Sequence, residues 1–203
     1  DMKQNIIAGY NISCVGDDRA YSYLPSRAGN TISDDVAIHV LKNIDPEFVT
    51  YTWKDRGSDE RQYCAPHVDL PIASIMRTKY GEYAEYHTSL DDLVNVVTKD
   101  GLYGGYRALK LAIQAIEYNG FPMVNVNCEP QLGKRGLYPT LSTKDVHAEV
   151  SLMMDLITWS DGTKSLLEIA EICEIPIWSL YPILQDMVDH DLLSVVHDRC
   201  LPH

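Results

Sequence analysis

The sequence predicts an α/β domain, a mostly parallel sheet with flanking helices, followed by a small winged-helix domain. Residues 1–120 alternate strand-like and helix-like patterns, an order typical of a parallel sheet. Residues 143–203 show the order helix, helix, turn, helix and short strand, which is that of a winged helix. Between them, proline and glycine punctuate residues 121–142, so we expect a linker or an extended arm there.

Three strands and a helix are expected early in the first domain. Asn5–Ser13 is mostly apolar, Phe48–Trp53 is rich in β-branched and aromatic residues, and Pro71–Arg77 contains an apolar run. A helix should cover Asp34–Asn43, because Thr31 can cap it and acids occupy its first turn. The side chains of this helix expected to point inward are those of Val36, Val40 and Leu41.

Two further helices are expected before residue 120. Thr88–Val97 can be capped by Thr88 or Ser89. Leu102–Tyr118 is longer, and Gly120 lies just past its end. The apolar positions of this longer helix, expected to be its buried side, are Leu109, Ala112, Ile113 and Ile116.

The winged-helix prediction depends on four elements. Val146–Thr158 has the pattern of an amphipathic helix. Ser165 and Glu168 have the spacing of a capping box and start a second, short helix. A third helix is expected over Ser179–His190, and Leu192–Val196 should form the closing strand.

Charge and composition exclude several partners and locations. The formal net charge is −12, and residues 143–203 hold three Lys/Arg against eleven Asp/Glu. Nucleic acid and anionic membranes are bound mainly through Lys and Arg, so neither is expected as a partner. No apolar run approaches the roughly 20 residues that span a bilayer. The five cysteines are widely spaced and lack a C-x-x-C motif, which favours a reduced, cytoplasmic protein.

The most informative stretch is residues 57–93, in which charged and metal-capable side chains flank an apolar strand. Such groups are costly beside a buried strand unless they hydrogen-bond, pair or hold a metal. Asp59, Glu60 and Arg61 follow a strand end, where ligands of parallel sheets gather. The two acids could contact a metal-bound water or a substrate amine, and Arg61 a substrate carboxylate. A solvated acidic turn with an internal salt bridge is the alternative.

Two other positions are candidates for the same site. His87, which follows Tyr86 at an expected helix start, could bind a metal through one imidazole nitrogen. A histidine that only hydrogen-bonds at the helix start is the alternative. Asp18, in the loop Asp17-Asp18-Arg19, is a second candidate carboxylate at the sheet edge, and a turn cap is its alternative.

Three patterns are weaker. His67 and Asp69 could supply two ligands on an extended segment, but pairs of this kind often arise by chance. The glycines of residues 101–105 lack the lysine and the spacing of a phosphate-binding loop. Cys64 has no neighbouring base beyond His67, so we expect a buried structural thiol.

Several segments together are similar to a known group. Gly57-Ser-Asp-Glu-Arg-Gln-Tyr-Cys64, the strand entry Leu70-Pro71, Glu85-Tyr-His-Thr-Ser-x-Asp91 and the earlier run Cys14–Arg27 resemble bacterial aminopeptidase-like proteins related to zinc-dependent aminopeptidases. Members of that group carry a C-terminal winged helix, as expected at residues 143–203. The resemblance covers nearly the whole chain and implies a partial zinc-aminopeptidase-like sheet.

The resemblance also implies a chemistry and a set of site residues. In the zinc aminopeptidases the final metal ligand is a histidine followed by Thr and, shortly after, Asp, as at His87-Thr88-x-x-Asp91. A zinc ion there would polarise the scissile carbonyl of a small peptide or amide substrate, and a carboxylate base would shuttle the proton. The residues expected to contact the substrate are Asp59, Glu60, Arg61, Tyr86 and Asp18.

The chain departs from the pattern of that group. The group places an earlier His and Asp ligand pair and an acidic general base upstream of the strand that opens this chain, and no Glu-Glu pair occurs here. Asn11 stands where the zinc aminopeptidases use an aspartate ligand, although Asp17 or Asp18 could substitute. Catalytic zinc usually takes three protein ligands. We therefore expect the C-terminal portion of a longer protein, inactive by itself, with zinc weakly bound or absent.

Two functions stay open. One is a metal-dependent aminopeptidase-like hydrolase. The other is a degenerate hydrolase scaffold whose acidic winged helix binds a protein partner or a second copy. In the second, Trp178 and Tyr181 would be exposed anchors, unless they belong to the core.

Overall fold

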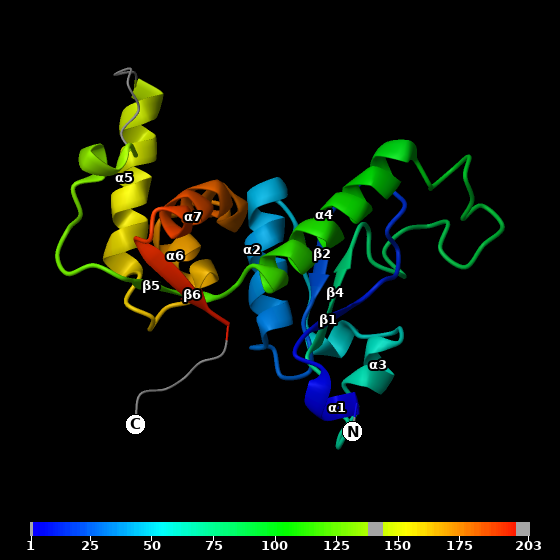
Figure 1. Ribbon diagram of the computed structural model, residues 1–203. Helices are drawn as coiled ribbons and strands as arrows, with labels where there is room; N and C mark the ends of the chain where they lie inside the picture. Colours follow the sequence, from blue (N-terminus) through cyan, green and yellow to red (C-terminus); the bar gives the residue numbers. More distant parts are fainter. Residues whose placement is uncertain (1, 138–143, 198–203) are drawn as a thin grey trace. The chain divides into compact units, whose positions relative to one another are not determined.

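The computed structural model describes residues 2–137 and 144–197. The chain forms two compact units, Asp1–Ile116 and Glu117–His203, and each has its own sheet (Figure 1). No helix in the described part of the chain is long and apolar enough to cross a membrane.

The first unit is built on a four-stranded sheet in the order β1-β4-β2-β3. β1 (Gly9–Asn11) is parallel to β4 (Ile72–Met76), and β2 (Ser22–Leu24) is parallel to β3 (Val49–Thr50). The central pairing of β2 with β4 is antiparallel. The predicted α/β class is confirmed, with parallel pairs on both sides of one antiparallel pairing. No strand is expected at β2 from the sequence, because three residues between two polar loops show no period.

Short helices accompany the sheet of the first unit. They are α1 (Met2–Asn5), the 3₁₀ turn η1 (Trp53–Asp55) and α3 (Glu60–Tyr63). The longer α2 (Ile32–Ile44) begins with the expected capping box, in which the Asp34 carboxylate accepts hydrogen bonds from the backbone N–H and the hydroxyl of Thr31. Its inward positions are the expected ones, since Val36, Val40 and Leu41 are fully buried.

The helix α4 (Lys99–Glu117) packs through small residues. Its buried positions are Gly101, Gly104, Gly105, Ala108, Ala112 and Ala115. A Cβ atom at Gly105 would lie 2.6 Å from the Val15 carbonyl oxygen, so these glycines allow the helix backbone to approach the loop after β1. The expectation for Ile113 is wrong: its side chain is 54% exposed, because the close approach leaves room only for small side chains inside.

The segment between β4 and α4 contains no helix, contrary to the helix expected over Thr88–Val97 (Figure 1). The carboxylate of Asp92 accepts hydrogen bonds from the backbone N–H groups of Val94 and Asn95, both at 2.8 Å. The Thr88 hydroxyl donates to the Glu85 carbonyl at 2.6 Å. Side chains of this kind offer the backbone turns in place of a helix, and here the turns prevail.

The second unit has the predicted winged-helix order. It contains α5 (Lys144–Trp159), α6 (Leu166–Ile172), the 3₁₀ turn η3 (Ile177–Ser179), α7 (Leu180–Asp189) and β6 (Leu193–Val196). The capping box of Ser165 and Glu168 is present at α6. The core of the second unit contains, among others, Leu156, Leu166, Ile169, Ile177, Leu180, Met187 and Leu192.

Part of the expected linker belongs to this second unit. β5 (Phe121–Val124) is antiparallel to β6, and the 3₁₀ turn η2 (Leu132–Arg135) follows it. No strand is expected here from the sequence, because proline is unfavourable inside a sheet. A two-stranded sheet has only edge strands, where proline is tolerated. Residues 138–142 of the expected linker lie outside the described residues.

Candidate functional site

The candidate site lies at the carboxyl ends of β1 and β4, which form one edge of the sheet of the first unit. Because β1 and β4 are parallel, the loops that follow both strands leave the sheet at the same edge. The backbone N–H of Arg77, just after β4, donates to the carbonyl of Cys14, in the loop after β1, at 2.8 Å. The turn formed by residues 57–59 is hydrogen-bonded to this edge through Glu60.

Glu60 is fully buried and connects three segments of the chain. Its Oε1 accepts hydrogen bonds from the backbone N–H groups of Gly57 and Ser58, at 2.7 and 2.9 Å, and from the Tyr80 hydroxyl at 2.8 Å. Its Oε2 accepts one from the Asn11 side-chain amide at 3.0 Å. These contacts give Glu60 the role of holding the turn 57–59 against β1 and the loop after β4, which differs from the expected substrate contact.

The ionisation of this pair follows from its contacts. Burial opposes the charged form of Glu60, but the hydrogen bonds from Ser58, Tyr80 and Gly57 outweigh it and hold the pKa of Glu60 below its ordinary value. Burial and the bond to Glu60 raise the pKa of Tyr80. At neutral pH the carboxylate is therefore ionised and Tyr80 is its neutral donor.

A second buried network joins the loops after β1 and β4. The Asp17 carboxylate accepts from the backbone N–H and the hydroxyl of Thr78, at 2.9 and 2.6 Å. The guanidinium of Arg77 donates to the Asp17 carbonyl at 2.7 Å and lies 3.7 Å from the ring centroid of Tyr21. Asp17 thus fixes the relative position of the two loops, which is the turn role weighed for this acidic run.

Asp18 is exposed and differs from its neighbour. Its Oδ2 accepts a hydrogen bond from the Thr98 hydroxyl at 3.0 Å, and the same hydroxyl accepts from the backbone N–H of Gly101 in the first turn of α4. Arg19 forms a bidentate pair with Glu85, with both N···O distances 2.9 Å. This pair fastens the segment that carries His87 to the loop after β1.

Aromatic rings line the segment after β4. Tyr86 lies 6.5 Å from Tyr80 and 5.6 Å from Tyr83, centroid to centroid. His87 stacks on Tyr86 at 4.0 Å with nearly parallel rings. The buried ammonium of Lys79 lies 4.4 Å from the Tyr80 ring centroid, which adds a cation–π contact. A continuous chain of contacts therefore runs from Glu60 through Tyr80 and Tyr86 to His87.

The structure brings some predicted residues together and separates others. Asp59 and Arg61 are exposed beside the buried Glu60, and Arg61 donates to the Ser58 carbonyl at 3.0 Å rather than pairing with Asp59. His87 is exposed, and its backbone has a positive φ of 58°. The sequence did not identify Tyr80, Arg77 and Lys79 as residues of the site. Only contacts with residues far away in the sequence connect them to it.

The predicted metal donors do not form a complete set. Among residues 3–137 and 150–197, whose side chains the structure describes, no three His, Cys, Asp or Glu side chains are grouped so that they could hold a metal ion. Of the weaker pair, Asp69 is engaged in a bidentate ion pair with Arg27, at 2.9 and 2.7 Å. Cys64 is buried and donates to the carbonyls of Leu70 and Ile72, which is a structural role.

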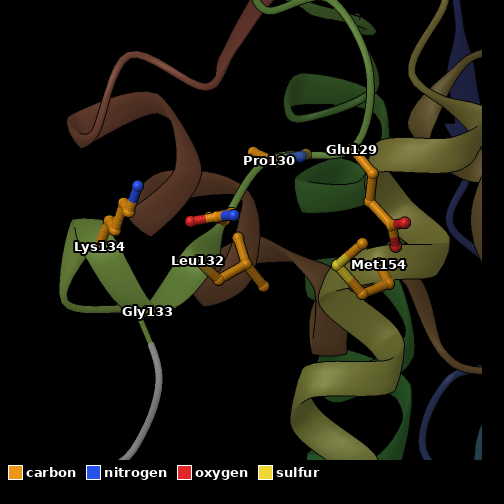
Figure 2. Close-up of a pocket in the computed structure, with 7 residues that line it drawn as sticks. Glu129, Pro130, Leu132, Gly133, Lys134 and Met154 are labelled. Atoms are coloured by element: carbon orange, nitrogen blue, oxygen red, sulfur yellow. The ribbon is translucent and has the colours of Figure 1, made fainter.

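A cavity of about 550 Å³ lies in the second unit and involves none of these residues. Figure 2 shows Met154 of α5 facing Leu132 and Glu129 across it. The remaining lining residues are Pro130, Gln131, Gly133 and Lys134. The cavity is an open pocket beside the segment that carries η2.

This chain is similar to proteins from Clostridium acetobutylicum. A curated relative from Clostridium acetobutylicum, described as a candidate polysaccharide biosynthesis protein with an aminopeptidase-like domain, is 37% identical over 172 residues. That match covers 84% of this chain and 39% of the relative. A crystal structure of a candidate peptidase from the same species matches with a TM-score of 0.84 and 32% identity, over 96% of this chain and 43% of that one. This chain therefore spans about two fifths of the length of each.

Two family descriptions account for the two units. The domain of unknown function DUF4910 matches residues 1–119, and a winged helix-turn-helix family matches residues 121–195. The first match covers the unit with the buried Glu60 and the edge that carries His87. Because the first match spans more than half of this chain, the chain belongs to the DUF4910 family, and its residues 121–195 match a winged helix-turn-helix family.

Proposed function

We propose that this chain is part of an aminopeptidase-like hydrolase that acts on a peptide or amide bond, with its site at the carboxyl edge of β1 and β4. The observation that carries the proposal is the contact chain from Glu60 to His87. It brings the segments 57–64 and 85–91 to one sheet edge, although they are separate in sequence. The names of the two relatives support the same reaction class.

The exposed residues at this edge are assigned to substrate contact. Asp59 would bind a substrate amine and Arg61 a substrate carboxylate, since both side chains are exposed, Asp59 on the turn held by Glu60 and Arg61 in α3. Tyr86 and Asp18 border the same edge and are proposed to line it. Glu60 acts as a positioning residue, because its oxygens are occupied by four donors.

Zinc is proposed only for an assembly larger than the described residues. His87 offers one imidazole nitrogen, and the described side chains supply no grouped second and third ligand. The metal, when bound, would polarise the scissile carbonyl. Within this chain, the aromatic segment would orient His87 and Arg19 would hold that segment in place.

The proposal is tested by hydrolysis of aminoacyl 4-nitroanilides and dipeptides, with and without added zinc, in the longest native form of the protein. We expect Asp59→Ala and His87→Ala to lower kcat/KM by roughly tenfold or more, and Arg61→Ala to raise KM for substrates with a free carboxylate. His190→Ala, at an exposed histidine of the second unit, is the control. Unchanged activity in the His87 and Asp59 variants would overturn the assignment.

A second function is favoured by the charge of the winged helix. The exposed residues of α7 include Gln185, Asp186 and Asp189 and no Lys or Arg, so this helix is unsuited to phosphate contacts. We propose that the domain binds a protein partner or a second copy rather than nucleic acid. Tyr181 stacks on Tyr118 at 4.7 Å, so it is a packing residue more than a free anchor. Binding to random duplex DNA that weakens as salt is added would contradict this proposal.

We also propose a cytoplasmic location. Cys14, Cys64, Cys128 and Cys173 are free thiols in the structure. Reduced thiols are the ordinary state of cysteine in that compartment. Fractionation of the native cells with antibody detection would test it, and recovery in the secreted fraction would contradict it.

A further inference from the structure

We infer that the cavity of the second unit binds a short apolar peptide, with the amino group of the peptide at Glu129 and its carboxylate at Lys134. This site goes beyond the proposed function. All of its lining residues belong to the second unit, and it shares none with the edge formed by β1 and β4. Peptide binding there can therefore be measured without hydrolysis.

The cavity has the size of a ligand site and adjoins a second pocket. Its volume of about 550 Å³ falls within the range of roughly 300–1,000 Å³ that is usual for small-molecule sites. The neighbouring pocket has a volume of about 360 Å³. Glu129 lines both, and α5 supplies Met154 to the first and Ile157 and Thr158 to the second. The two pockets together suit an elongated ligand better than a compact one.

Two opposite charges lie in the lining of the cavity. Figure 2 shows the side chains of Glu129 and Lys134 toward opposite ends of it, with Leu132 between them. Both charged residues are exposed. Within the part of the chain whose side chains are described, neither the Glu129 carboxylate nor the Lys134 ammonium has a hydrogen bond or an ion pair. A ligand with an amino group at one end and a carboxylate at the other would pair with both without displacing a protein group.

The lining between these charges is largely apolar, which selects the kind of ligand. The thioether of Met154 adapts to side chains of different shape. Gln131 adds an amide that can both donate to and accept from a peptide group. A single amino acid has its two charged groups on one carbon and does not reach both ends, whereas a short peptide does. The other apolar lining residues of the two pockets are Pro130, Leu132, Val124, Val126 and Ile157.

Calorimetric titration of the 203-residue chain with trileucine tests the site. We expect one peptide bound per chain. Glu129→Gln and Lys134→Gln should each weaken binding about threefold, as is usual when a solvent-exposed ion pair is removed. Triglycine has the same charges without apolar side chains and should bind more weakly by roughly tenfold or more. Glu174→Gln, at an exposed acid of the second unit outside the cavity, is the control and should leave the affinity unchanged.

Modified peptides assign each end of the ligand to its partner. N-acetyltrileucine lacks the amino charge and should bind the parent chain about threefold more weakly than trileucine does. It should bind Glu129→Gln as well as trileucine does, because the pair is already broken. Trileucine amide, which lacks the carboxylate, should show the same relation to Lys134→Gln.

The contrary outcomes are equally definite. Absence of binding, or losses from peptide and protein changes that simply add, would overturn the peptide site. Binding that Asp59→Ala or Arg61→Ala abolishes, and that the Glu129 and Lys134 variants retain, would assign trileucine to the proposed hydrolytic edge instead. Binding with the crossed losses, in a protein whose longest native form cleaves no peptide, would support the peptide site and remove the hydrolase function, so the two can be told apart.

Discussion

Replacing Glu60 is the most direct test of how the site is held together. In Glu60→Ala, four donors lose their acceptor. The backbone N–H groups of Gly57 and Ser58 are near solvent and can bind water, and the Tyr80 hydroxyl keeps a longer bond to the Asp55 carbonyl at 3.4 Å, but the Asn11 amide is buried in this network. A hydrogen bond to a charged group is worth about 1.5–3 kcal/mol, and the bonds from Asn11 and Tyr80 are both lost, so we expect a loss of about 3–5 kcal/mol in the free energy of unfolding.

The matched variant Glu60→Gln keeps the shape and removes the charge. Its amide oxygen can still accept from Gly57, Ser58 and Tyr80, and the Asn11 amide can turn over to offer its own oxygen to the new NH₂ group. Only the charge assistance of the hydrogen bonds is lost, so we expect a cost of about 1–2 kcal/mol.

The assay is urea unfolding at pH 7, followed by the fluorescence of Trp53 in a background of Trp159→Phe and Trp178→Phe. This background leaves a single tryptophan, in the first unit, so the signal reports on that unit alone. A loss below about 1 kcal/mol in Glu60→Ala, or equal losses in the two variants, would refute the buried-network reasoning.

Three further results are expected. Because the pKa of Glu60 is held low, its contribution to stability is present at pH 7, begins to be lost below the unfolded value of about 4.3 and is gone below the folded-state pKa; urea midpoints between pH 7 and pH 3 should fall less in Glu60→Gln than in the parent. Gly105→Ala should destabilise the first unit by about 2 kcal/mol although alanine gains about 1 kcal/mol in helix propensity, because the new Cβ atom would meet the Val15 carbonyl. A melting temperature equal to that of Ile113→Ala, at an exposed position of the same helix, would contradict this. Ser165→Ala should cost the second unit about 1 kcal/mol through loss of the capping box, measured by Trp178 fluorescence; no change would show that α6 is held by packing alone.

Elements with strong local signals were predictable from the sequence. The capping boxes at Thr31 and Ser165 fixed the starts of α2 and α6, because a cap acts over four residues. The helix expected over Thr88–Val97 was wrong because side chains such as that of Asp92 satisfy the backbone with turns. β2 and β5 are too short to show a period, and only their pairing partners define them.

The place of the candidate site followed from the sheet only in part. The loops after the parallel strands β1 and β4 leave the sheet at one edge, which brings the segment of His87 near the loop after β1. The strand before Asp59, β3, runs antiparallel to β1 and β4, so the position of Asp59 depends on the hydrogen bonds of Glu60 instead. Which acid lies inside did not follow. Glu60 is buried because Asn11 and Tyr80, 49 and 20 residues away, supply its donors, and no local pattern encodes such partners.

The Glu60 network also sets an order of events during folding. Its three segments come together only after chain closures of 49 and 20 residues, which carry an entropy cost that local contacts cannot offset. The turn carrying Asp59 should therefore become ordered late, after β1 and β4 have paired in register. A nascent or clipped chain that lacks either strand would carry the residues of the turn without their arrangement.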